Sequence, residues 1–218
     1  IAIYGDAIDC KERGGTLNEE HWNESSSLAH QPYGYSKTVA EQEAWKMVKE
    51  QTRWDLVTIN PGFVMGPSLT SRNDSASIDF LLGLIGGKFA AGMSDFWTPW
   101  VDVRDVAFAH VEAVVRPEAE GRHILAVKNA PVFEIIDALK EEIEHPIKLP
   151  KMKAPKWLAY LMGPFFGFGW KYVTRNIEIP LHLDNTRSIE KLGVNYRPLK
   201  QTLRDHVDQL VADGLYSP

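Results

Sequence analysis

The stretch HQPYGYSKTVAEQE, residues 30–43, decides how this chain is interpreted. Pro32 suits the first position of a helix, and the pattern that follows predicts a helix from Pro32 to about Gln51. Because Tyr33 and Lys37 stand at i and i+4, their side chains lie on one helical face, about one turn apart. The same face continues through Ala40, Ala44 and Val48.

A phenol held beside an ammonium group is an arrangement suited to proton transfer near neutral pH. A free tyrosine titrates at about 10, and a neighbouring positive charge favours the phenolate. The spacing therefore marks Tyr33 and Lys37 as a candidate catalytic pair. The alternative is an ordinary pair of surface side chains.

Two apolar runs flank this helix in the sequence. Residues 1–4, Ile-Ala-Ile-Tyr, and residues 55–60, Asp-Leu-Val-Thr-Ile-Asn, predict short strands. Strand, helix and strand within about 60 residues are typical of a βαβ unit with parallel strands. Ligands of parallel α/β sheets collect outside the carboxyl ends of the strands. We therefore expect the tyrosine–lysine pair and the Pro61-Gly62 turn to face one ligand site.

The remaining pattern predicts loops and helices in alternation. Residues 7–31 are polar and rich in glycine and serine, which predicts a long surface loop. The further expected elements are a loop at 68–76, a helix at 78–85, a helix opening at Val101 with Asp102 as its cap, a strand at 121–127, an amphipathic helix at 132–144 and mostly helix thereafter, with Gly193 and Gly214 closing two late helices.

Composition limits the classes of function. The chain has 218 residues, 44% hydrophobic content and a formal net charge of −5, which suits a globular protein and disfavours a nucleic-acid surface. Cys10 is the single cysteine, which allows no intrachain disulfide and fits a reducing cytoplasm. The sequence predicts no membrane span and no metal site. The basic and then aromatic stretch from Lys151 to Trp170 favours a substrate lid or helix packing over a membrane-surface helix.

Four stretches resemble the extended short-chain dehydrogenases/reductases, and within them the dihydroflavonol reductase-like and cinnamoyl-CoA reductase-like subgroup. Their order and spacing agree with the family as well as their letters, and together they cover about residues 1–128. They are Ile3-Tyr-Gly-Asp6, similar to the strand end after the family's catalytic Ser or Thr; Tyr33-Gly-Tyr-Ser-Lys37-Thr-Val-Ala-Glu41, similar to the Tyr-x-x-x-Lys helix; Asn60-Pro-Gly-Phe-Val-Met-Gly-Pro67, similar to the segment after the nicotinamide; and Trp100-Val-Asp-Val-Arg-Asp-Val-Ala107, similar to a later helix opening.

The resemblance implies an NAD(P)H-dependent reduction of an aldehyde or ketone to an alcohol. Tyr33 would be the general acid, and Lys37 would assist it and hydrogen-bond the nicotinamide ribose. NADP is the expected cofactor, with NAD possible, and the expected substrate is a small-molecule carbonyl compound.

The same resemblance implies further contact residues. Pro61, Gly62, Phe63 and Val64 are expected to contact the nicotinamide, although they equally suit a structural end to the strand. Ser75 is expected to touch the cofactor. The aromatic residues expected either to wall an apolar substrate pocket or to pack in the core are Phe96, Trp97 and Trp100.

The chain departs from the family at its cofactor-binding motif. The family opens with a Gly-x-x-Gly-x-x-Gly turn that seats the pyrophosphate, and no such turn follows a strand here. We therefore expect that roughly the first third of the enzyme lies upstream of Ile1. On this expectation the 218 residues alone bind NADP(H) weakly and catalyse poorly, and an open sheet edge favours association with another copy or with the missing part.

The predicted fold class is α/β, the C-terminal half of a Rossmann-like parallel sheet with a mostly helical substrate-binding region. Residues 1–67 and 100–128 are assigned to the Rossmann half, and residues 68–99 and 129–218 to the substrate-binding region. Two alternatives stay open for the function. One is a nucleotide-sugar epimerase or dehydratase on the same fold, and the other is a non-catalytic dinucleotide-sensing protein.

Overall fold

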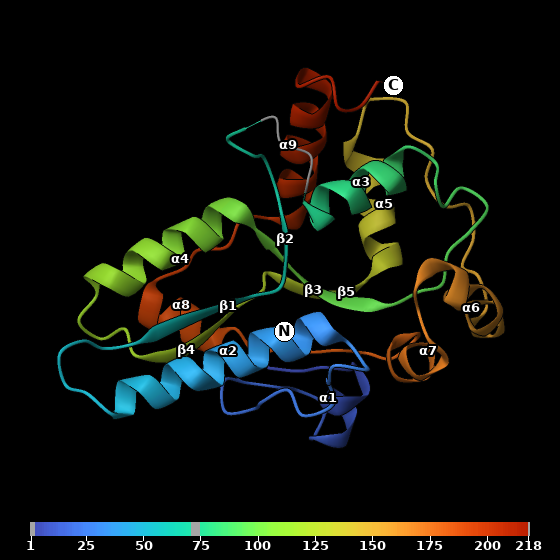
Figure 1. Cartoon of the computed structure of the whole chain (residues 1–218). Helices are drawn as coiled ribbons and strands as arrows, with labels where there is room; N and C mark the ends of the chain where they lie inside the picture. Colours follow the sequence, from blue (N-terminus) through green and yellow to red (C-terminus); the bar gives the residue numbers. More distant parts are fainter. Residues whose placement is uncertain (1–2, 71–74, 218) are drawn as a thin grey trace.

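A computed structural model describes residues 3–70 and 75–217 of the chain. Helices and short strands alternate along it (Figure 1). The elements are α1 (Ile8–Glu12), α2 (Pro32–Lys49), β1 (Val57–Pro61), β2 (Phe63–Met65), α3 (Ala76–Ile85), β3 (Trp97–Asp102), α4 (Val103–Val115), β4 (Gly121–Leu125), β5 (Lys128–Pro131), α5 (Val132–Glu142), α6 (Lys156–Met162), the 3-10 helix η1 (Gly163–Phe166), α7 (Trp170–Asn176), α8 (Thr186–Leu192) and α9 (Leu199–Ala212).

The described strands form two small sheets. β1 pairs in parallel with β4, with Val57 opposite Gly121 and Pro61 opposite Leu125. In the second sheet, β3 pairs in parallel with β2 and antiparallel with β5. Parallel strands need long crossover connections, which the helices provide. Parallel strands joined by helices confirm the predicted α/β class.

The N-terminal segment differs from the sequence-based expectation. Residues 1–2 of the expected first strand lie outside the described residues, and the strand predicted for residues 3 and 4 is wrong. Ile3 is buried in an apolar cluster instead, and β1 takes β4 as its parallel neighbour. The Asp9 carboxylate accepts hydrogen bonds from the backbone N–H groups of residues 5 and 6, which turns the chain into α1 within the expected loop.

Helix α2 has nearly the predicted bounds, with Pro32 in its first turn. Its buried residues are Gly34 and Thr38, and the side chain of Glu41 is 9% exposed. Tyr33, on the face expected to point toward a ligand site, is exposed. Glu41 tolerates burial because it forms an ion pair with Arg122, whereas an unpaired charge there would be strongly destabilising.

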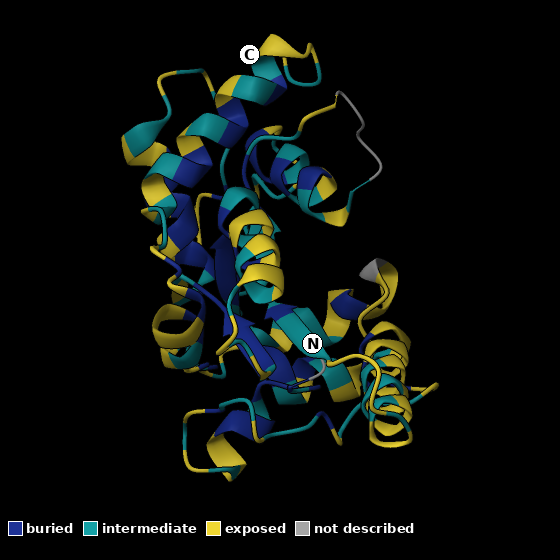
Figure 2. Cartoon of the chain, turned by 90° about the vertical axis from the view of Figure 1, so that its left-hand side faces the viewer, coloured by how far each residue is buried: buried dark blue, intermediate teal, exposed yellow. Residues whose placement is uncertain are grey.

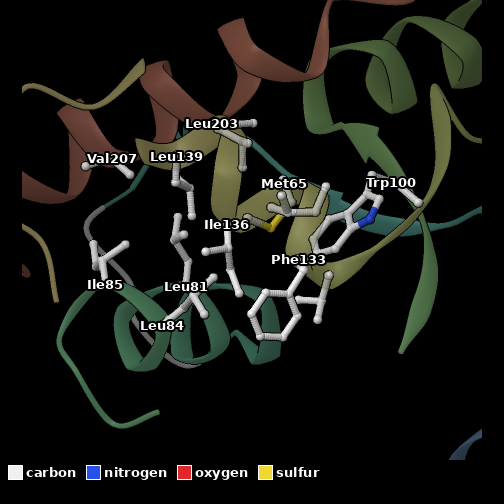
Figure 3. Packing of buried hydrophobic residues seen from close by; sticks show 14 of the residues in the cluster. Met65, Leu81, Leu84, Ile85, Trp100, Phe133, Ile136, Leu139, Leu203 and Val207 are labelled. Atoms are coloured by element: carbon white, nitrogen blue, oxygen red, sulfur yellow. The ribbon is translucent and has the colours of Figure 1, made fainter. Parts of the chain in front are cut away.

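The main hydrophobic core lies between α3, α5 and α9 and the β2–β3–β5 sheet (Figure 3). Helix α5 presents its buried face to α9, as its predicted amphipathic pattern requires. Full burial of one aliphatic side chain in this core stabilises the folded protein by about 1.5–3 kcal/mol. Members of this core in Figure 3 are Met65, Leu81, Leu84, Ile85, Trp100, Phe133, Ile136, Leu139, Leu203 and Val207.

Several predicted helix ends are confirmed. Asp102 caps α4, because its side chain accepts a hydrogen bond from the Arg104 backbone N–H at 2.7 Å. Gly193 ends α8 with φ of 67°, a left-handed conformation that glycine adopts freely. The mostly helical character of the C-terminal part is confirmed as well.

Burial follows the strands and the inner faces of the helices, and the outer faces are exposed (Figure 2). The segment of α6 and α7 carries exposed aromatic side chains, among them Trp157 and Trp170. Within the described residues, no helix combines the length and the apolar character needed to cross a membrane. The division into a Rossmann half and a substrate-binding region stays a prediction.

Candidate active site

A cavity of about 940 Å³ lies where α2 faces β1, the chain that follows β1 and the start of α3. It brings together Tyr33 and Lys37, predicted to be catalytic and to contact the cofactor, and the five further residues predicted to contact the cofactor. Its lining consists of Tyr33, Lys37, Ala40, Glu41, Thr58, Ile59, Asn60, Pro61, Gly62, Phe63, Val64, Ser75, Ala76 and Ser77.

The tyrosine and lysine lie on the open side of this cavity. The Lys37 Nζ atom is 5.7 Å from the centroid of the Tyr33 ring, as expected of residues one helical turn apart. Both side chains are exposed, and α2 holds their backbones in regular helix. A proton donor and a cation therefore face the same space.

Residues Pro61 to Val64 form the opposite wall. They belong to the end of β1 and the start of β2, so the expected turn is an almost continuous extended segment. Gly62 is needed there, because a Cβ atom at this position would lie 2.5 Å from the Pro99 carbonyl oxygen on β3. The Phe63 ring is fixed from behind by an edge-to-face contact with Trp100, with centroids 5.3 Å apart.

Ser75 occupies the N-cap position directly before α3, and its side chain makes no capping hydrogen bond there. Its hydroxyl is 2.9 Å from the hydroxyl of Ser77, and both belong to the lining. The first backbone N–H groups of a helix have no partner within that helix, so they suit an anionic or polar ligand.

The cavity floor holds a polar network that the sequence-based prediction missed. Glu41 accepts hydrogen bonds from Thr58 Oγ1 at 3.0 Å and Asn60 Nδ2 at 2.9 Å, and from Arg122 Nε at 2.7 Å. Burial by itself raises the pKa of Glu41, but the hydrogen bond and charge of Arg122, helped by Asn60 and Thr58, outweigh it and lower that pKa. Glu41 therefore stays ionised. The sequence signal that could have identified Glu41 was its position four residues after Lys37, one further turn along α2.

One polar atom of the lining has no partner among the described residues. Asn60 Oδ1 is buried and accepts no hydrogen bond there, whereas its Nδ2 atom donates to Glu41. A buried acceptor without a donor is unfavourable.

The three aromatic residues predicted to bind substrate are absent from the described lining of the cavity. Trp100 is fully buried in the core, Phe96 contacts Phe80 edge to face, and the Trp97 ring contacts His182. Trp100 contacts the ring of Phe63, which belongs to the cavity lining. Among the described residues there is also no group of three or more His, Cys, Asp or Glu side chains suited to a metal ion.

Comparisons with known proteins show the family of this chain. The family described as "NAD dependent epimerase/dehydratase family" matches residues 2–127. Cinnamoyl-CoA reductase CAD2 of Medicago truncatula is 33% identical over 179 residues, which are 82% of this chain and 47% of that protein. Tetraketide alpha-pyrone reductase 2 of Arabidopsis thaliana is 37% identical over 202 residues, 91% of this chain and 56% of that protein.

A solved structure with a related fold carries a cofactor. Gre2 of Candida albicans in complex with NADPH has a TM-score of 0.66 and 26% identity, covering 93% of this chain and 59% of that one. The chain spans about half the length of the curated relatives it matches.

Proposed function

The chain belongs to the NAD dependent epimerase/dehydratase family, among the extended short-chain dehydrogenases/reductases of the cinnamoyl-CoA reductase-like subgroup, and on that premise we propose that it carries the proton-transfer site of an NADPH-dependent carbonyl reductase. One observation carries the proposal. Tyr33 and Lys37 line the same cavity as Pro61 to Val64 and Ser75. The expected substrate is a small aldehyde or ketone.

The cavity fits a nicotinamide cofactor in size and chemistry. Its volume of about 940 Å³ is in the range of ligand pockets, roughly 300–1,000 Å³. The wall at Pro61 to Val64 is apolar, which suits a flat ring. Lys37 and the Ser75 hydroxyl provide polar contacts on the other side. A bound nicotinamide supplies the hydride that the protein lacks.

Tyr33 is proposed to act as the general acid. Its hydroxyl donates a proton to the carbonyl oxygen of the substrate as negative charge develops there. The resulting phenolate is stabilised by the Lys37 ammonium, one helical turn away. Pro61, Gly62, Phe63 and Val64 would hold the ring, and Ser75 would hydrogen-bond the cofactor. Substrate contacts by the three predicted aromatic residues stay a prediction.

NADP is the proposed cofactor, with support from outside this chain. The Candida albicans Gre2 structure contains NADPH, and the curated relatives are reductases by name. The choice between NAD and NADP depends on residues that bind the adenosine ribose.

Replacement of the proposed acid tests the function. In the intact protein as its host expresses it, Tyr33→Phe should lower kcat/KM for NADPH-dependent aldehyde reduction by about 10²–10⁴-fold, because the proton donor is lost. Tyr35→Phe is the matched control, since Tyr35 is on the same helix but outside the cavity lining, and should keep wild-type activity. The readout is the oxidation of NADPH with aromatic and aliphatic aldehydes.

Full activity of the Tyr33→Phe protein would overturn the proposal. So would a purified protein that retains oxidised NAD tightly and reduces no free carbonyl compound, since that behaviour belongs to an epimerase or dehydratase. A protein that binds NADPH without any turnover would point to a dinucleotide sensor.

A further inference from the structure

Asp6 is the centre of a buried polar cluster directly before the N-terminus of α2. Its side chain is fully buried and accepts hydrogen bonds from His30 Nε2 at 2.9 Å and Gln31 Nε2 at 2.6 Å. From the other side, Arg175 Nε donates at 2.5 Å and Asn176 Nδ2 at 2.7 Å. The cluster therefore joins the start of α2 to the end of α7, which Figure 1 shows side by side.

The donors keep Asp6 ionised. Burial by itself raises the pKa of Asp6, but the hydrogen bonds from Asn176, Arg175 and His30, with the charge of His30, outweigh it and lower that pKa. A carboxylate accepts stronger hydrogen bonds than a neutral group. Gln31 is therefore held by a strong acceptor.

Gln31 has an unusual backbone conformation. With φ of 55° and ψ of 57° it is left-handed, which side chains with a Cβ atom rarely adopt. Its side chain does not cap α2 but donates to Asp6 and to the Gly5 carbonyl oxygen, the latter at 2.8 Å. A conformation of this kind persists only where surrounding contacts enforce it, and such residues concentrate at functional sites.

The conformation of Gln31 sets the direction of the first turn of α2. The Gln31 carbonyl oxygen accepts the Tyr35 backbone N–H at 3.1 Å, the first bond of the helix. Tyr33 lies between these two residues and is exposed, so its own side chain is not held by packing. Lys37 lies one turn further on and is less sensitive to how the helix begins.

We propose that Gln31, clamped by Asp6 in a left-handed conformation, is a positioning residue that aims the Tyr33 hydroxyl into the cavity. The inference rests on the proposed function of Tyr33. It adds that Arg175 and Asn176 of α7, in the region predicted to bind substrate, are tied to the helix of the proton donor by the same carboxylate.

The test is a double-mutant cycle in the intact protein. Gln31→Gly removes the amide that binds Asp6 and Gly5, and it frees the backbone, because glycine adopts left-handed and right-handed conformations about equally readily. It should lower kcat/KM for carbonyl reduction by about 10- to 100-fold, the scale expected for a misplaced catalytic group. In the Tyr33→Phe background the same change should cost almost nothing, since no proton donor is left to position.

Gln51→Ala is the matched control at the other end of α2. Gln51 also forms local hydrogen bonds, to Val48 O and Trp54 O and from the Arg53 and Trp54 backbones, but lies outside the cavity lining. Its replacement should keep kcat/KM unchanged. Circular dichroism and thermal unfolding of each variant verify that the folded fraction is the same.

Two results would overturn the inference. One is wild-type activity of Gln31→Gly, and the other is an equal loss in the presence and absence of the Tyr33 hydroxyl, which would mean that Gln31 acts only through general stability. Failure of the proposed function is distinguishable, because Tyr33→Phe alone would then retain activity.

Discussion

Single polar side chains inside this protein are held in one protonation state by their surroundings. His206 of α9 is an example: it is 2% exposed, and its Nδ1 atom accepts the Gly66 backbone N–H at 3.1 Å. Burial lowers the pKa of His206 to about 4, although the charge of Asp102 acts in the opposite direction. The folded protein therefore requires this imidazole to be neutral.

We predict that His206 makes the protein lose stability as the pH falls from about 6.5 to about 4. In this pH window the His206 imidazole is protonated in the unfolded chain and neutral in the folded protein. The free energy of unfolding therefore decreases by up to about 3 kcal/mol. His206→Asn retains an acceptor for Gly66 and cannot be protonated. Its urea unfolding curves should depend less on pH, by up to about 1.4 kcal/mol per pH unit.

His145→Asn is the control for that measurement. His145 is partly exposed and pairs with Asp208 at 3.3 Å, so its replacement should leave the loss of stability in acid in place. Identical pH profiles of the wild type and the His206→Asn protein would contradict the prediction.

At the scale of elements, a buried ion pair joins α2 to the sheet. The side chains of Glu41 and Arg122 are 9% and 8% exposed, and Arg122 belongs to β4. Arg122 also donates to the backbone oxygens of Glu19 and His21 and lies 3.8 Å from the Trp22 ring centroid. The pair therefore connects the helix of the candidate catalytic residues, the parallel strands and the N-terminal loop.

Glu41→Gln should lower the free energy of unfolding by about 3 kcal/mol, because a buried arginine loses its counter-charge. The control is Glu43→Gln on the same helix, where the exposed pair with Lys46 at 3.4 Å is worth at most about 0.5 kcal/mol. Urea unfolding measures both variants. Equal midpoints for the two proteins would show that the buried pair is not the attachment of α2.

At the scale of the whole molecule, stability depends on the core that α3, α5 and α9 build on the β2–β3–β5 sheet. The candidate site is supported by this core, because Phe63 lines the cavity and packs on the buried Trp100. Self-association also belongs to this scale and stays a prediction. Exposed apolar side chains on α4, among them Val111 and Val114, are candidates for the contact surface of such self-association.

Leu139→Ala should lower the free energy of unfolding by about 2–5 kcal/mol. Leu139 of α5 is fully buried in the core, and the change leaves a cavity there. Val114→Ala, at a site that is 85% exposed, should change it by no more than about 0.5 kcal/mol. Denaturant unfolding compares the two. A Leu139→Ala protein as stable as the Val114→Ala protein would mean that the core relaxes to fill the space.

Local patterns in the sequence were sufficient for many of the elements. The periodicity after Pro32 predicted α2, the β-branched run before Pro61 predicted β1, and Asp102 and Gly193 marked helix ends, because caps and periodicity act over a few residues. The strand predicted at the N-terminus was wrong for residues 3 and 4, and the bonds of Asp9 to the backbone, unmarked by periodicity, lead into α1 within the predicted loop.

The sequence by itself determined the family, the α/β class and the tyrosine–lysine spacing on one helix. Only the tertiary structure decided that Pro61 to Val64 and Ser75 share a cavity with that pair, that Glu41 is buried against Arg122, and that Gln31 is left-handed. The physical reason is distance along the chain. The partners of these groups, such as Arg175 for Asp6, are far away in sequence, and only the packing of the whole chain brings them within a hydrogen bond of each other.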